Sequence, residues 1–213
     1  MDNIFKKPWV WIIIVGLLVA GSILYLDTLE VEEGEEVVLR VNGTSFTQSE
    51  FDEVASMVRD NPDAYGASTE EEIREEAIGV AVQQTLLLEH ASDMGMDPTE
   101  EEVEAKIKEM MDVYDLTEEE LLEEMQMTRD EAEEYFIMET KVNGLFQYYA
   151  EEIDITEEDI EQAYALYSAQ QDMPPLDEVA EEINRALLEN QVTSILLSKV
   201  EEMKEGAQIE VLF

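Results

Sequence analysis

The sequence has no cysteine and very little positive charge. Without cysteine the chain offers no disulfide framework, no thiol nucleophile and no cysteine for lipid attachment. Only 12 Lys and Arg residues stand against 54 Asp and Glu residues, which gives a formal net charge of −42. Because such a charge repels nucleic acid and anionic lipid headgroups, we expect no nucleic-acid partner.

Motifs for catalysis and cofactor binding are also missing. The only histidine, His90, falls at the end of a predicted helix, which favours a structural role over catalysis. The chain has no glycine-rich phosphate loop, no His-Glu-x-x-His and no Asp-rich calcium loop. Carboxylates are too numerous for any pair to stand out as an acid and a base. We therefore predict that the protein is not an enzyme and uses no cofactor and no metal.

The acidic excess first suggests disorder, but 45% of the residues are hydrophobic and they recur at helical spacings. At molar salt the Debye length falls to about 3 Å, so most of the self-repulsion is screened. The composition therefore predicts a folded protein adapted to a hypersaline habitat. Specific binding of cations or basic clients is the alternative interpretation.

One uncharged apolar run stands near the N-terminus. Residues 9–26, WVWIIIVGLLVAGSILYL, nearly reach the ~20-residue length of a membrane-spanning helix. Lys6 and Lys7 precede the run and acidic residues follow it. Since basic residues favour the cytoplasmic side, we predict a cytoplasmic segment 1–8, a single transmembrane anchor 9–26 in contact with the bilayer, and an extracytoplasmic remainder.

A cleaved signal peptide is the alternative for this region. Lys6 and Lys7 would form its basic start, and Ala20-Gly21-Ser22 would hold the cleavage site. Apolar residues continue past that site to Leu26, which favours a retained anchor. Either interpretation places the remainder of the chain outside the cytoplasm, with localisation at the cell membrane in the anchored case.

Two short strands are predicted at opposite ends of the exported part. After an acidic linker at 27–36, the segment 37–46 alternates like a strand and ends in an Asn-Gly turn signal. Asn42 also begins an Asn-Gly-Thr sequon, so glycosylation is the alternative to a purely structural turn. The segment 208–213 alternates as well. Because an isolated strand leaves its backbone groups unpaired, we expect the two strands to form a two-stranded sheet.

The intervening sequence predicts helices that begin with capping boxes. Each start has a threonine followed three residues later by Glu or, once, by Asp. The threonines are Thr47, Thr69, Thr99, Thr117, Thr128 and Thr156. The predicted helices span 47–60, 69–95, 99–112, 117–125, 128–152 and 156–170, and a last helix runs from Pro175 to about Glu205.

Methionine and aromatic residues gather in the middle of the chain. Methionine is flexible and polarizable, which suits a surface that accepts varied apolar partners. Filling the cores of small helices is the alternative role, and the sequence leaves both open. The candidates for binding unfolded polypeptide are Met110, Met111, Met125, Met127, Tyr135, Phe136, Met138, Phe146 and Tyr149.

The order of these segments is similar to a known family. VLRVNGTSFTQSEFDE, IREEAIGVAVQQTLLLEHASDMGMDPTEEEVEAKI, LTEEELLEEMQMTRDEAEEYF and IDITEEDIEQAYALY resemble the N-terminal chaperone module of SurA- and PrsA-type extracytoplasmic folding factors. PPLDEVAEEINRALLENQ through AQIEVLF resembles the helix and strand that return to this module. The resemblance implies one mainly α-helical domain over 37–213, with a main part at 37–170 and a returning part at 173–213.

The chain departs from the longer relatives between these two parts. Their parvulin-type prolyl isomerase domain has no counterpart here, because only SAQQD separates Tyr167 from Met173. The resemblance therefore implies a chaperone that holds unfolded or newly exported polypeptides without isomerase activity. A scaffold that binds one specific envelope protein is the alternative function. The sequence does not specify the clients or the oligomeric state.

Overall fold

The computed structural model describes residues 36–169 and 173–213. The predicted cytoplasmic segment, the anchor at 9–26 and all but the last residue of the acidic linker lie outside this part of the chain, so they stay predictions. Within the described residues no helix is both long and apolar enough to cross a membrane.

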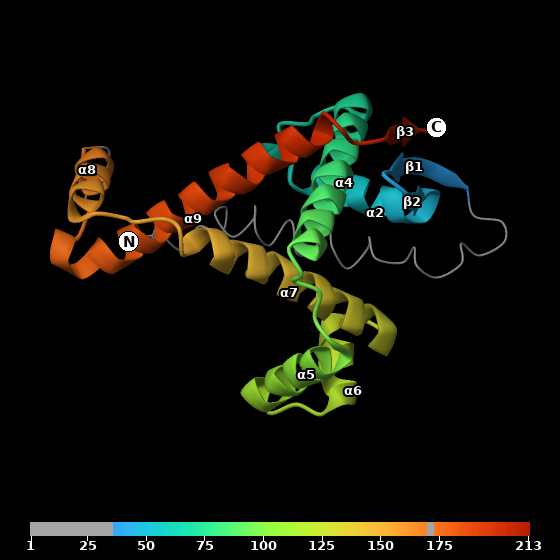
Figure 1. Cartoon of the computed structure of the whole chain (residues 1–213), viewed down its shortest axis with the longest axis horizontal. Helices are drawn as coiled ribbons and strands as arrows, with labels where there is room; N and C mark the ends of the chain where they lie inside the picture. The colour runs from blue at the N-terminus through green and yellow to red at the C-terminus, as the bar shows by residue number, and fades with distance from the viewer. Residues whose placement is uncertain (1–35, 170–172) are drawn as a thin grey trace.

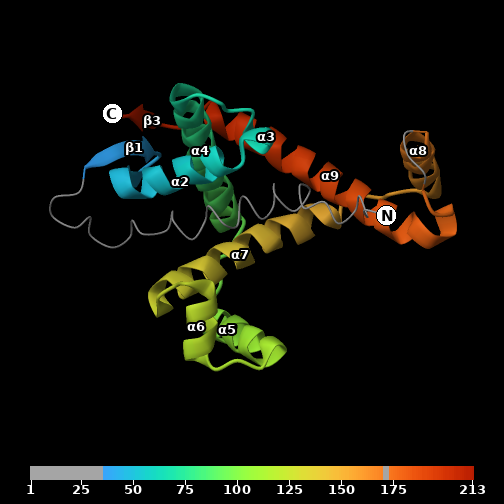
Figure 2. The same cartoon turned by 180° about the vertical axis from the view of Figure 1, so that it is seen from behind.

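The described part is mainly helical, with one small sheet (Figures 1 and 2). In chain order the elements are β1 Val37–Val41, β2 Thr44–Thr47, α2 Gln48–Asp60, α3 Pro62–Tyr65, α4 Glu70–Asp93, α5 Glu100–Tyr114, α6 Glu118–Met125, α7 Arg129–Ala150, α8 Glu157–Ser168, α9 Leu176–Lys204 and β3 Ile209–Val211.

The six predicted capping boxes are all present. At each start the threonine hydroxyl accepts the amide proton of the residue three positions on, and that residue's carboxylate accepts the threonine amide proton. Such caps stabilise a helix end by about 1 kcal/mol each. Helix α9 differs from the prediction, because Pro175 precedes it as the N-cap with an extended ψ of 147° and does not enter its first turn.

The prediction of a two-stranded sheet was wrong. The segment 37–46 does not form one strand, because Asn42 adopts a left-handed φ of 55° and turns the chain into a hairpin of β1 and β2. The sheet therefore has three strands in the order β2-β1-β3. The predicted pairing of the two chain ends is confirmed, since β1 and β3 are antiparallel with Leu39 opposite Val211.

The main core lies where the sheet meets α2, α4, α7 and α9. Leu39, Val54, Ala77, Leu145 and Val192 are among its fully enclosed side chains. We call this part the central body. Helix α9 runs back along the molecule to β3, so the C-terminal segment packs into the same core as the first strand (Figure 1).

Two smaller units project from the central body (Figures 1 and 2). The first, called the α5–α6 lobe, consists of α5, α6 and the first turns of α7 around four buried side chains, Val103, Ile107, Leu121 and Phe136. The second, called the α8 arm, packs α8 on the start of α9 through Ala163, Val179 and Ile183. Only residues 169–175 lie between α8 and α9, too few for an inserted domain.

Candidate functional site

The nine residues predicted to bind unfolded polypeptide lie on or beside α5, α6 and α7, but they do not form one surface. Phe136, Met138 and Tyr149 are buried, and the other six are half-buried. Phe136, Met138 and Tyr149 therefore fill the core, which is the alternative role given to these residues above.

The structure divides eight of these side chains among three clusters, while Met127, between α6 and α7, belongs to none of them. Met110, Met111, Met125 and Tyr135 pack around Phe136 in the core of the α5–α6 lobe. Phe146 and Tyr149 belong to the central body, and Met138 packs with Leu88 and Val142 between α4 and α7. The four side chains around Phe136 pack on one another's neighbours in this core, so they help to stabilise the α5–α6 lobe.

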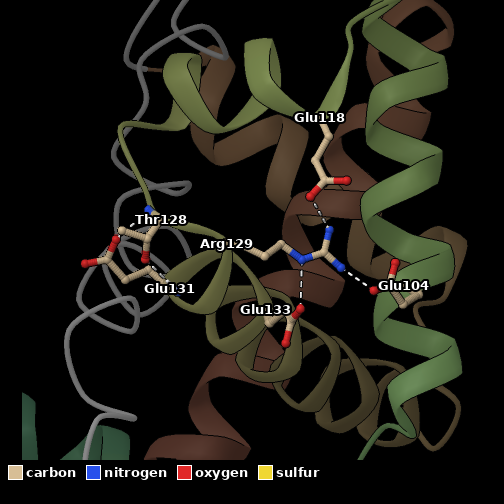
Figure 3. Close-up of polar contacts among 6 residues, drawn as sticks. All are labelled: Glu104, Glu118, Thr128, Arg129, Glu131 and Glu133. Atoms are coloured by element: carbon tan, nitrogen blue, oxygen red, sulfur yellow. Dashed lines mark hydrogen bonds and ion pairs between the residues drawn. The ribbon is translucent and has the colours of Figure 1, made fainter.

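An arginine that the sequence analysis did not single out connects the helices of this lobe. Arg129, at the start of α7, is 26% exposed and donates to Glu118 on α6 at 2.8 Å and to Glu133 on α7 at 2.7 Å. It also pairs with Glu104 on α5, so one guanidinium contacts all three helices (Figure 3). The hydrogen bond to Glu133 is the main reason that the pKa of Arg129 is raised. The lobe therefore has an ionic connection beside its small apolar core.

A second cation connects α7 with the end of α4. Lys141 is 3% exposed, and its Nζ lies 2.6 Å from Asp97 and 2.9 Å from the hydroxyl of Ser92. The hydrogen bond from Lys141 is the largest cause of the lowered pKa of Asp97. This contact attaches α7 to the loop that leads from the central body into the α5–α6 lobe.

His90 has a partner that fits the structural role predicted for it. Its Nε2 lies 2.7 Å from the hydroxyl of Tyr149, which joins α4 to α7. Burial, followed by the positive charge of Lys199, lowers the pKa of the imidazole. Within the described residues no three His, Asp or Glu side chains converge as metal ligands.

Asn42 serves as the turn residue of the β1–β2 hairpin, which confirms the predicted turn. Its Nδ2 donates to Glu89 on α4 at 2.5 Å, and its Oδ1 accepts from the backbone amide of Gln208 at 2.9 Å. The side-chain amide is thus engaged with two other parts of the fold. Glycosylation at this sequon is not tested and stays a prediction.

Most of the large exposed apolar side chains lie at the ends of the molecule, whereas Tyr148 lies on α7 and Leu197 on α9. Val113 and Tyr114, at the end of α5, are 67% and 61% exposed. Others lie on the α8 arm and on the C-terminal strand, and the α5–α6 lobe, α8 and β3 occupy three separate extremities in Figure 1. The remaining large exposed apolar residues are Tyr148, Leu166, Tyr167, Leu197, Ile209, Val211, Leu212 and Phe213.

These surface positions were missed by sequence reasoning because they share no motif. Val113 and Tyr114 follow the half-buried Met110 and Met111 in the last turn of α5, before Asp115 ends the helix with a left-handed φ of 54°, and they lie outside the face that packs into the lobe. The predicted strand at 208–213 carried the one usable signal, because a strand at the edge of a small sheet keeps one side open.

The family model of the SurA-like N-terminal domain matches residues 1–136, more than half of the chain. No curated protein matches the chain.

Proposed function

This chain belongs to the SurA-like N-terminal domain family, and from that membership we propose that it is a membrane-anchored extracytoplasmic chaperone. It holds unfolded, newly exported polypeptides and has no prolyl isomerase activity. The bilayer contact is made by residues 9–26, whose composition is that of a membrane-spanning helix.

The observation that carries this proposal is the distribution of exposed apolar side chains over separate extremities. Tyr114 on α5, Leu166 on α8 and Val211 on β3 are each at least half exposed, although together they belong to no single pocket. At these extremities the exposed apolar side chains have exposed apolar neighbours in the chain, as with Val113 and Tyr114 or Leu166 and Tyr167. An exposed apolar patch commonly marks an interaction site. Separate small sites suit a flexible client chain that makes several weak contacts at once. Because the contacts are linked through the client, the overall affinity exceeds that of any single contact.

The acidic surface supports a holding role in strong salt. The carboxylates that give the net charge of −42 are strongly hydrated, and this hydration would keep complexes loaded with an apolar client soluble even where salt screens charge repulsion. Molar salt screens the repulsion within the domain, and it strengthens apolar contacts when the salt is a kosmotrope. The proposal therefore places the activity at high ionic strength, with no nucleotide and no other cofactor.

The test is the aggregation of an unfolded client in molar salt, followed by light scattering with and without the full chain. The informative variant combines Tyr114→Ser, Leu166→Ser and Val211→Ser. The control combines Glu101→Ser, Glu161→Ser and Glu201→Ser at exposed acidic positions of α5, α8 and the end of α9. The proposal expects suppression by the wild type and the control and weaker suppression by the first variant. Equal suppression by all three, or none by any, would contradict it.

A scaffold that binds one envelope protein is the second candidate, since separate apolar extremities also fit one fixed partner. Crosslinking of the full chain in its native membrane distinguishes the two. Many unrelated polypeptides in the crosslinked material support the chaperone, whereas one stoichiometric protein supports the scaffold.

A further inference from the structure

The two edges of the sheet are built differently. The β2 edge is short and mostly polar, with Thr44, Ser45 and Thr47, and its register against β1 shifts between Val37 and Leu39. Thr47 also caps α2, so the chain leaves the sheet at once. Shortness, polar side chains and irregular pairing are the usual features that keep a sheet edge from pairing with another chain.

The β3 strand is short as well, with three residues, but its pairing with β1 is regular. Its side chains are mostly apolar, and Ile209, Val211, Leu212 and Phe213 are each 40–50% exposed. Among the described strands β3 pairs only with β1, so its other side faces outward. An apolar strand with an open edge is a template for a further strand.

The register identifies the backbone groups that face this open edge. The amide of Asn42 donates to the carbonyl of Gln208, and the amide of Leu212 donates to the carbonyl of Val38, both at 2.8 Å. In an antiparallel pair the residues that bond to the neighbouring strand alternate with those that bond away from it. The N–H and C=O groups of Ile209 and Val211 therefore point outward.

Side-chain contacts hold β3 in place along its whole length. At its start the Oδ1 of Asn42 accepts from Gln208, and in its middle Glu210 pairs with Arg40 at 3.5 Å. At its end the ring of Phe213 lies 4.8 Å from that of Phe51 on α2 and 4.6 Å from the guanidinium of Arg74 on α4. A strand fixed in this way loses little freedom when another strand pairs with it, which favours binding.

We propose that the outer edge of β3 binds an extended apolar segment of an unfolded polypeptide, flanked by basic residues, as an added strand. This inference rests on the proposed function and names the contact through which a client is held. Backbone hydrogen bonds to Ile209 and Val211 do not depend on client sequence, whereas alternate apolar side chains of the client lie beside those of β3. The site thus accepts many clients and prefers apolar ones.

Charge favours a client over a second copy of this chain. Three exposed acids surround the strand: Glu205 precedes β3 by four residues, Glu210 lies in its middle, and Glu36 comes two residues before Val38, which pairs with Leu212. Basic residues on either side of an apolar segment would therefore be attracted, while a second copy would add another net charge of −42. A strand this short also falls well below the roughly 800 Å² per partner that a stable dimer buries.

The first experiment measures the affinity of the full chain in molar salt for a labelled peptide. The peptide has about ten alternating Val and Thr residues, long enough for one strand, with lysine pairs at both ends. Val211→Pro removes an outward N–H that β1 does not use, and Val211→Thr is the matched control that keeps it. We expect Val211→Pro to weaken binding by about tenfold or more and Val211→Thr to change it little.

The second experiment leaves the protein unchanged and alters the peptide. Methyl groups on the N–H groups of one peptide edge leave the other edge able to pair, so binding is expected to persist. Methyl groups on both edges should abolish it. If the doubly methylated peptide binds as well as the unmodified one, or if Val211→Pro binds as well as wild type, the inference is wrong.

The outcomes separate this inference from the proposed function. If Val211→Pro suppresses client aggregation as well as wild type does, the β3 edge is not the holding contact and the chaperone proposal stands. If wild type suppresses no aggregation, the proposed function fails and the inference fails with it. If sedimentation instead shows a dimer that Val211→Pro abolishes, the occupant is a second copy and the inference is overturned.

Discussion

The central body and the α5–α6 lobe are held together by different forces. The body buries side chains from the sheet and four helices, including Leu39, Val54 and Ala77 with no exposed surface. The lobe has only four buried apolar side chains, and it adds the three carboxylates around Arg129. The stabilisation from a large apolar core does not depend on charge screening, whereas the stabilisation from surface ion pairs falls as the salt concentration rises. The comparison indicates that the lobe opens at lower cost than the body.

The largest effect is expected from Phe136→Ala, which removes the main aromatic side chain from the core of the lobe. The loss of a buried phenylalanine costs about 4 kcal/mol. Because Phe136 packs with Val103, Ile107 and Leu121, we expect hydrogen exchange to accelerate in α5 and α6 while the central body keeps its protection. Equal acceleration in both regions would mean that lobe and body unfold as one unit.

The matched change in the central body is Leu39→Ala. This side chain is fully buried in β1, and its truncation is expected to cost about 3 kcal/mol. Denaturant unfolding followed by far-ultraviolet circular dichroism should shift to lower denaturant, by the same free energy in dilute and in molar salt. A cost that fell as the salt rose would contradict the apolar origin assigned to the body's stability.

Arg129→Met tests the ionic connection of the lobe. Three partly exposed ion pairs, each stabilising by up to about 1 kcal/mol, give an expected loss of about 2 kcal/mol in the local stability of α5 and α6 in dilute salt. The loss should shrink in molar salt. Lys106→Met is the control, since it removes the same charge from α5 but breaks only the pair with Glu109. Equal losses in the two variants would show that the three-way contact adds nothing.

The smallest effect concerns Glu134, whose Oε2 is buried without a hydrogen-bond partner. Burial, and then repulsion from Asp130, Glu131, Glu133 and Glu50, raises the pKa of this carboxyl. A raised pKa in the folded state means that the folded protein binds the proton more readily than the unfolded chain does. The ionised form therefore costs stability at neutral pH, and the cost disappears as pH falls through the raised pKa.

Glu134→Gln should accordingly stabilise the lobe at about pH 7, and its advantage should vanish near pH 4. Urea titrations at a series of pH values measure this difference. Glu119→Gln, at an exposed position of α6, is the control for the change in net charge. If Glu134→Gln raises the free energy of unfolding at neutral pH no more than the control does, the buried carboxylate does not destabilise the lobe.

Local features of the fold were predictable from the sequence because their signals lie within a few residues. The threonine at each helix start and the carboxylate three residues on gave six helix starts correctly. The hairpin was missed because Asn42-Gly43 was placed at the end of a strand, although the residues after it alternate as well. The pairing of the chain ends followed from the need to satisfy backbone groups.

The candidate site was less predictable because it depends on packing between distant segments. Met138 and Tyr114 look alike in a sequence rich in apolar residues, yet the first is buried against α4 and the second is exposed in the last turn of α5. The contacts of Arg129 require α5, α6 and α7 to converge, and the angles between these helices do not follow from the local sequence. The open edge of β3 is visible only when the strand order is known.

The most direct test of the account is hydrogen exchange on the full chain in molar salt, with and without an unfolded apolar client. The account predicts that the client slows exchange at Ile209 and Val211 and at the exposed ends of α5 and α8. The buried segment around Phe136 and Met138 should be protected already and should not change. Exchange that is the same with and without client throughout the described residues would contradict the claim that this protein holds unfolded chains through its exposed apolar extremities.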